Sequence, residues 1–193
     1  EPQQRKLLGV PVVLYRKQDG SLVAMKDRCA HRLAPLSMGR VEGDAIRCLY
    51  HGFRFGADGQ CDEIPGQDQI PPAACVQTFR VEEVGSWAWV WMGDPALADP
   101  SVIAQGKALD DPEWVLSTGQ IDYEANYELI NDNLLDLTHL AYVHVASFGA
   151  DEAWSRNRPK ITPLDNGVRS ARWIEGGPPI PPLGDAAGHD VVD

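Results

Sequence analysis

The chain has 193 residues, 44% of them hydrophobic, which suffices for one large or two small packed domains. Its net charge of −11 argues against a nucleic-acid partner, because phosphates would repel an acidic surface. No apolar run approaches the roughly 18 residues that span a membrane, and residues 1–6 lack the apolar core of a signal peptide. Four cysteines do not make a disulfide framework, so we expect a cytoplasmic protein.

Residues 1–100 are expected to be rich in β-structure. A hairpin is indicated where Asp19-Gly20 joins two short apolar runs, and Gly43-Asp44 separates two further runs in the same way. The predicted strands cover residues 10–15, 22–26, 38–41, 45–48, 53–55, 76–84 and 87–91. In the last strand three tryptophans, at 87, 89 and 91, share one face. We interpret this stripe as core or interface packing and not as a ligand site.

Two metal half-sites lie in this region, at predicted junctions between strand and loop. Cys29-Ala-His31 and Cys48-Leu-Tyr-His51 are sixteen residues apart and supply two thiolates and two imidazoles. A Rieske [2Fe–2S] centre needs that ligand set, with His replacing Cys on one of its two irons. Zinc can use the same residue types, but its patterns usually pair Cys with Cys and His with His along the chain. The mixed half-sites favour the cluster.

The remaining cysteines, Cys61 and Cys75, are interpreted as reduced packing thiols, and His189 as a solvated surface residue. Asp-Pro steps between residues 93 and 111 predict a boundary without regular structure. A strand is predicted over 114–121. Beyond residue 150 the chain is polar and rich in proline, so residues 176–182 are expected to form a loop, and no terminating element is visible.

A helix is predicted over 127–143, with Asn126 as its N-cap. On this helix Asp136 and His139 share a face, whereas His144 lies about 140° further round than His139. We therefore expect the helix to end, loosen or carry a π-bulge between the two histidines. Two His and one carboxylate form the facial triad of non-haem Fe(II) oxygenases. Asp136 could be that carboxylate, or it could accept a hydrogen bond from the ring of His139.

Together these motifs resemble the oxygenase component of Rieske non-haem iron aromatic oxygenases, most closely the vanillate O-demethylase and dicamba monooxygenase group. The resemblance runs from about residue 7 to residue 147, on the segments 29–37, 48–55 and 131–144. It implies an α+β chain: an all-β Rieske domain over 1–100, then the start of a catalytic domain of helix-grip type, an antiparallel sheet with helices, over 101–193. It also implies homotrimers.

The resemblance also implies a role for each site residue. One cluster iron would be bound by two thiolates and the other by two imidazoles, from Cys29, Cys48, His31 and His51. His139 and His144 would bind a mononuclear Fe(II), with Asn133 close to it. Asp136 would be an electron bridge, hydrogen-bonded to His139 of its own subunit and to His51 of a neighbouring one. The family's carboxylate ligand lies far beyond residue 193, so we expect the chain to be a fragment that also lacks a short N-terminal stretch.

The implied function is oxygen chemistry in the catabolism of aromatic compounds. Electrons from NAD(P)H would arrive through a separate reductase or ferredoxin, and O₂ would be used to hydroxylate or O-demethylate an aromatic acid such as vanillate. Monooxygenation is favoured over dioxygenation. The main alternative is a Rieske ferredoxin-type electron carrier without oxygen chemistry, against which the chain length and the predicted 127–143 helix argue. A zinc-stabilised binding module is a third interpretation.

Overall fold

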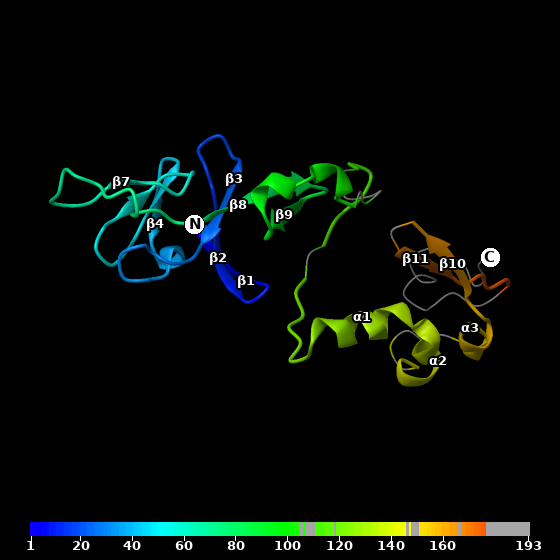
Figure 1. Ribbon diagram of the computed structural model, residues 1–193. Coiled ribbons are helices and arrows are strands. Elements are labelled where there is room, and N and C mark those ends of the chain that lie inside the picture. Colours follow the sequence, from blue (N-terminus) through cyan, green and yellow to red (C-terminus); the bar gives the residue numbers. More distant parts are fainter. Residues whose placement is uncertain are drawn as a thin grey trace. The chain divides into compact units, whose positions relative to one another are not determined.

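The computed structural model in Figure 1 describes residues 1–104, 106, 111–117, 119–145, 147, 151–165 and 167–176. The chain divides into two compact units, residues 1–118 and residues 119–193, and each is described by itself. Among the helices in these described ranges, none combines the length and the apolar character needed to cross a membrane.

A five-stranded antiparallel sheet, in the order β1-β2-β3-β8-β9, forms one part of the first unit (Figure 1). Its strands are β1 (Gln3–Leu7), β2 (Val10–Arg16), β3 (Leu22–Lys26), β8 (Thr78–Val84) and β9 (Trp87–Trp91). The β2–β3 hairpin confirms the prediction from Asp19-Gly20, because Gly20 adopts the positive φ of +86° that the turn requires. Strand β1 was not predicted.

A four-stranded antiparallel sheet, in the order β4-β5-β6-β7, forms the other part and leads into the second half-site. Its strands are β4 (Arg40–Glu42), β5 (Ala45–Arg47), β6 (Arg54–Phe55) and β7 (Cys61–Glu63), and the 3₁₀ helix η1 (Leu36–Met38) precedes them. Cys29 follows β3 and Cys48 follows β5, so both half-sites begin where a strand ends, as predicted.

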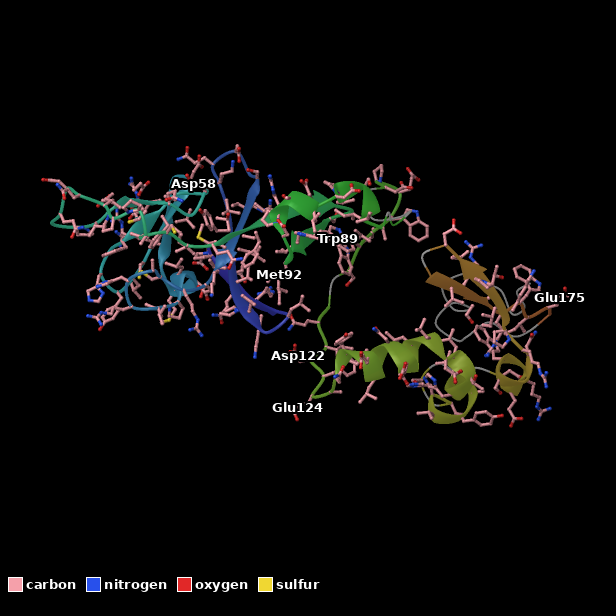
Figure 2. The ribbon with its side chains drawn as sticks, in the orientation of Figure 1. Asp58, Trp89, Met92, Asp122, Glu124 and Glu175 are labelled. Carbon is pink, nitrogen blue, oxygen red and sulfur yellow. The ribbon has the colours of Figure 1, made fainter. Side chains whose placement is uncertain are left out.

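The core of the first unit lies on two faces of β2 and β3. Val12 packs with Ala24 and Phe79, whereas Val13 and Met25 face a larger cluster, because successive side chains of a strand point to opposite faces. Met92, labelled in Figure 2, packs against the smaller cluster. The larger cluster includes the fully buried Leu36, Ile46 and Phe55 together with three cysteines, Cys29, Cys48 and Cys61. The ligand loops therefore stand on the larger core cluster.

Two expectations about the end of the first unit need correction. The tryptophans of β9 are not core residues of this unit, since Trp87 is 60% exposed and Trp89, labelled in Figure 2, is 37% exposed. Of the two predicted roles, core packing is therefore wrong and interface packing stays a prediction. The segment after β9 does contain regular turns, the 3₁₀ helices η2 (Pro95–Leu97) and η3 (Pro100–Val102). Asp94 and Asp99 cap them by accepting hydrogen bonds from backbone amides two residues on, both at 2.9 Å.

The predicted strand over 114–121 is also wrong. The described residues there, which exclude 118, form no strand, and Val115 and Ile121 are 97% and 75% exposed. Strand propensity reflects packing against neighbouring strands, and this stretch has no strand beside it within the described part of the chain. Its apolar side chains alone do not order it.

In the described part of the second unit, helices come first and a hairpin follows them (Figure 1). Its elements are α1 (Tyr127–Leu135), η4 (Leu137–His139), α2 (Leu140–Val143), α3 (Glu152–Arg156), β10 (Lys160–Leu164) and β11 (Gly167–Ala171). Asn126 is the N-cap of α1, as predicted, and its side-chain oxygen accepts from the amide of Glu128 at 2.9 Å. The hairpin β10–β11 and helix α3 were not predicted. His189 and residues 177–182 of the predicted loop lie outside the described residues.

The prediction of one continuous helix over 127–143 is wrong, because Asp136 interrupts it. Asp136 has extended backbone angles, φ −107° and ψ 94°, and serves both as the C-cap of α1 and as the N-cap of η4. Its carboxylate accepts hydrogen bonds from the amide of Thr138, at 2.9 Å, and from the Thr138 hydroxyl. Asp side chains compete with the helix in this way because they offer nearby backbone donors an alternative acceptor.

Candidate metal centres

The two cysteines of the half-sites meet inside the core of the first unit. Cys29 and Cys48 are 2% and 3% exposed, and their thiols interact directly. Burial raises the pKa of the Cys29 thiol to about 11 and the Cys48 thiol adds to the rise, whereas the backbone amides of His31 and Arg32 oppose it by donating to the sulfur. A bound cation would reverse this preference for the protonated thiol, because a metal ion stabilises thiolate.

The two histidines of the half-sites also meet, at the surface. The ring centroids of His31 and His51 are 4.6 Å apart at an interplanar angle of 65°. Phe53 stacks on His31 at 4.8 Å, and Tyr50 lies against His51 at 3.9 Å, so aromatic neighbours orient both imidazoles. Desolvation and the neighbouring His51 lower the pKa of His31, which favours the neutral ring that a metal requires.

This sorting of ligands fits a Rieske cluster. Such a cluster takes two thiolates on one iron and two imidazoles on the other. The fold pairs Cys29 with Cys48 in the core and His31 with His51 at the surface, although each pair comes from two different loops. A tetrahedral zinc ion would instead draw all four donors around one point. In the described ranges, no group of three or more His, Cys, Asp and Glu side chains is arranged to hold a single metal ion.

The loop that carries Cys29 and His31 is held by a buried carboxylate. Asp27 is 2% exposed and its Oδ1 accepts from the amide of Ser37 at 2.7 Å. Its Oδ2 accepts from the Ser37 hydroxyl at 2.7 Å and from the side-chain amide of Gln4. Asp27 thereby ties the end of β3 to η1 and to β1 across the ligand loop. No feature of the sequence pattern singles out Asp27.

The other two cysteines differ in position. Cys61 is buried in the larger core cluster, which agrees with the prediction of a packing thiol, and burial raises its pKa. Cys75 is exposed, so its prediction as a packing residue is wrong. It lies in the Pro71–Val76 segment, where its backbone bridges to Gln60 while its side chain faces solvent.

The second candidate site lies in the second unit, where η4 and α2 bring His139 and His144 together. Their ring centroids are 5.3 Å apart at 60°. Helix α2 ends at Val143, and His144 has non-helical angles, φ −106° and ψ 23°. The prediction that the helix ends between the two histidines is therefore confirmed, and the five-residue spacing becomes compatible with convergence of the two rings.

The hydrogen bond of His139 fixes which ring nitrogen can bind a metal. His139 Nδ1 lies 2.7 Å from the backbone carbonyl oxygen of Asp136. Because a carbonyl only accepts, Nδ1 carries the proton and Nε2 keeps its lone pair. The partner of this ring is thus the carbonyl of Asp136 and not its carboxylate, contrary to the expectation from the sequence.

The carboxylate of Asp136 is instead turned toward Thr138. The hydrogen bonds from the Thr138 hydroxyl and amide hold the pKa of Asp136 below its usual range, with smaller help from Arg172 and His139. Arg172, which follows β11, reaches Thr138 Oγ1 at 3.4 Å and donates to the Trp154 carbonyl at 2.8 Å. Nothing in the sequence pattern identified Arg172. Asn133 lies on α1, one helical turn before Asp136.

Two family matches cover most of the chain. Residues 1–80 match the Rieske [2Fe–2S] domain, and residues 123–191 match the vanillate O-demethylase oxygenase C-terminal domain. A toluene-4-sulfonate monooxygenase system iron–sulfur subunit from Comamonas testosteroni is 54% identical over 151 residues, which are 78% of this chain and 44% of that protein. The dicamba O-demethylase oxygenase component of Stenotrophomonas maltophilia is 38% identical over 93% of this chain and 53% of its own length.

Solved structures agree with these matches. A crystal structure of dicamba monooxygenase bound to dicamba superposes with a TM-score of 0.89 at 36% identity, covering 96% of this chain and 56% of that one. The chain thus spans about half the length of the curated relatives it matches. The resemblance drawn from the motifs, and the predicted all-β Rieske domain followed by a region with helices, are confirmed. The chain belongs to the family of oxygenase components that join a Rieske [2Fe–2S] domain to a vanillate O-demethylase-type C-terminal domain.

Proposed function

We propose that this chain is part of the oxygenase component of a Rieske non-haem iron monooxygenase that hydroxylates or O-demethylates an aromatic acid. The observation that carries the proposal is the His139–His144 pair, with ring centroids 5.3 Å apart, on the same chain as the two sorted ligand pairs of the first unit. An electron carrier needs only the first of these sites. The names of the relatives, which are oxygenase components and monooxygenase subunits, favour the oxygenase over the carrier.

In this proposal the first unit supplies the electron store. Cys29 and Cys48 would hold one iron of a [2Fe–2S] cluster in the core, where burial keeps water away from their sulfurs. His31 and His51 would hold the other iron at the exposed edge. When bound, the cluster accepts and returns one electron at a time. His31 and His51 are the proposed ligands that reach the surface. Their exposure supports them as the point at which electrons leave the cluster.

His139 and His144 would hold the mononuclear Fe(II) together with a carboxylate. The protonated Nδ1 of His139 presents Nε2 to the metal, and the Asp136 carbonyl holds the ring in that orientation. Asp136 is proposed as the link through which His51 of a neighbouring subunit passes electrons, with Asn133 close to the iron. Its lowered pKa keeps this carboxylate ionised near neutral pH.

The substrate class rests on the relatives. Their names include toluene-4-sulfonate, dicamba and vanillate, which are all aromatic anions. We propose an aromatic acid of this kind with O₂ as co-substrate, electrons from NAD(P)H through a separate reductase, a homotrimeric assembly and a cytoplasmic location. We place the Rieske domain at residues 1–100 and the start of the catalytic domain at 101–193.

The test begins with reconstitution of the chain with iron and sulfide under argon. We expect two irons and two labile sulfides per chain, and a Rieske-type EPR signal after reduction by dithionite. The cluster-loaded protein is then titrated with Fe(II). A further iron bound by the wild type, and lost in both His139→Ala and His144→Ala with the cluster intact, supports the oxygenase. Binding unchanged by both substitutions would leave only the electron carrier, and colourless protein without labile sulfide would refute both.

A further inference from the structure

Arg47 directly precedes Cys48 and reaches across the loop that carries Cys48 and His51. Its Nη1 donates to the backbone carbonyl of Gly52 at 2.7 Å. One side chain therefore spans the ligand loop from the residue before its first ligand to the residue after its second. The backbone closes the same loop with a bond from the Gly52 amide to the Cys48 carbonyl at 3.2 Å.

Two carboxylates hold the guanidinium of Arg47 against the four-stranded sheet. Glu63 of β7 accepts from Nη1 and Nη2 at 3.0 and 2.7 Å, and Glu42 of β4 accepts from Nε at 2.8 Å. The Arg47 side chain is only 13% exposed. Hydrogen bonds to Glu63 and then Glu42 raise the pKa of Arg47, so it stays charged. The bidentate pair with Glu63 fixes the orientation of the guanidinium group as well as neutralising its charge.

Arg47 also lies in a row of arginines, which explains the need for both acids. Across the sheet Arg40 is directly opposite Arg47, and Arg47 is opposite Arg54. Like charges facing each other across strands are destabilising. Glu42 and Glu63 offset that repulsion and leave the Nη1 of Arg47 aimed at the loop.

The exit of the loop has little freedom of its own. Gly52 adopts φ +75°, and a Cβ at this position would lie 2.8 Å from Cγ of Pro65. Arg47, Gly52 and Pro65 together form part of the wall of a groove of about 500 Å³ beside Cys48. A shorter side chain at 47 would therefore both release the Gly52 carbonyl and open this side of the loop to solvent.

We propose that Arg47 is a positioning residue that clamps the His51 end of the second ligand loop onto strands β4 and β7. It thereby sets how the His51 imidazole meets its iron and protects the cluster from loss. This inference rests on the proposed function, since it requires the cluster. Arg47 acts on the loop through its hydrogen bond to the Gly52 carbonyl.

Arg54 provides a matched control. It pairs with Asp62 at 2.8 and 3.2 Å and lies 3.5 Å from Glu63, so it belongs to the same acidic cluster. It makes no hydrogen bond to the ligand loop. Arg54→Gln removes an equal charge from the same sheet and leaves the Gly52 carbonyl bonded. A difference between Arg47→Gln and Arg54→Gln therefore reports the clamp and not the loss of charge.

The experiment compares reconstituted wild type, Arg47→Gln, Arg47→Lys and Arg54→Gln. For Arg47→Gln we expect altered g-values in the reduced EPR spectrum and release of iron to a chelator about 10- to 100-fold faster, the usual cost of losing a residue that orients a metal ligand. Arg47→Lys keeps the positive charge but has a single donor nitrogen, so its g-values and its rate of iron release should lie between those of the wild type and Arg47→Gln. Arg54→Gln should match the wild type in both measurements.

The proposal is overturned if Arg47→Gln shares both the EPR spectrum and the release rate of Arg54→Gln. If Arg47→Gln does not fold, the same comparison is decided by Arg47→Lys, whose spectrum and release rate must then differ from those of Arg54→Gln. A wild-type chain that takes up no cluster would instead refute the proposed function, and this inference with it.

Discussion

Replacing Asp27 should loosen the first ligand loop more than any surface acid would. Asp27→Ala removes three accepted hydrogen bonds of a residue that is only 2% exposed, and it leaves the part-buried amide of Ser37 without its acceptor. Bonds to a charged group are worth about 1.5–3 kcal/mol each and are not additive, so we expect a loss of about 3–5 kcal/mol in the free energy of unfolding. Asp27→Asn should cost about 1–2 kcal/mol, because its amide oxygen still accepts from Ser37.

Asp19 is the control for this substitution. It accepts from the amide and hydroxyl of Ser21 at 2.9 and 2.6 Å, the same two kinds of donor that Ser37 offers Asp27, but its side chain is 62% exposed. Asp19→Ala should therefore cost clearly less than Asp27→Ala. Urea unfolding followed by NMR on amides of β2 and β3 measures the loss in the first unit, and a chelator assay measures iron release from the loaded protein. Equal losses for Asp27→Ala and Asp19→Ala would refute the argument.

Two further predictions concern the backbone and the second site. Gly52→Ala should destabilise the first unit by about 1–3 kcal/mol, because of the positive φ at this position and the contact of the new Cβ with Pro65. Gly66 has a similar φ of +79° but open space around it, so Gly66→Ala should show only the cost of the positive φ. Thermal unfolding of both variants tests this. Thr138→Val should raise the pKa of Asp136 toward its usual value, and Thr138→Ser should not, as measured by NMR titration. Because the pKa of Asp136 is lowered in the folded state, the hydrogen bond from Thr138 stabilises the fold fully at pH values above the ordinary carboxyl pKa. This stabilisation is lost as the pH falls through the lowered pKa of the folded state.

The parts of the fold that were predicted correctly depend on local signals. The hairpin of β2 and β3 follows from turn residues that supply positive φ. The expected ligand set of the cluster rests on the spacing of Cys and His, and it stays a prediction. That the cysteines meet in the core and the histidines at the surface required the fold.

The errors arise where an element depends on partners rather than on its own pattern. Strand β1 is largely polar and exposed, and it forms because its backbone pairs with β2. Its sequence has no hydrophobic alternation from which a strand could be predicted. Conversely, residues 114–121 have strand-like side chains, and within the described part of the chain no strand lies beside them. The break at Asp136 did have a signal, since Asp-Leu-Thr is a capping sequence, but the apolar periodicity of 127–143 outweighed it.

The two ligand loops are held in the same way, and the hydrophobic periodicity of the sequence does not reveal it. Each loop is irregular, so its carbonyls and amides need partners that a strand ladder would otherwise provide. In both cases a charged residue at the end of the preceding strand supplies them: Asp27 accepts from Ser37 beyond His31, and Arg47 donates to Gly52 beyond His51. The charges are opposite because the first loop presents a donor and the second an acceptor. The loops that carry the proposed ligands are thus fixed from the neighbouring sheets, which suits the proposed function, because an electron-transfer centre works best when its ligands move little.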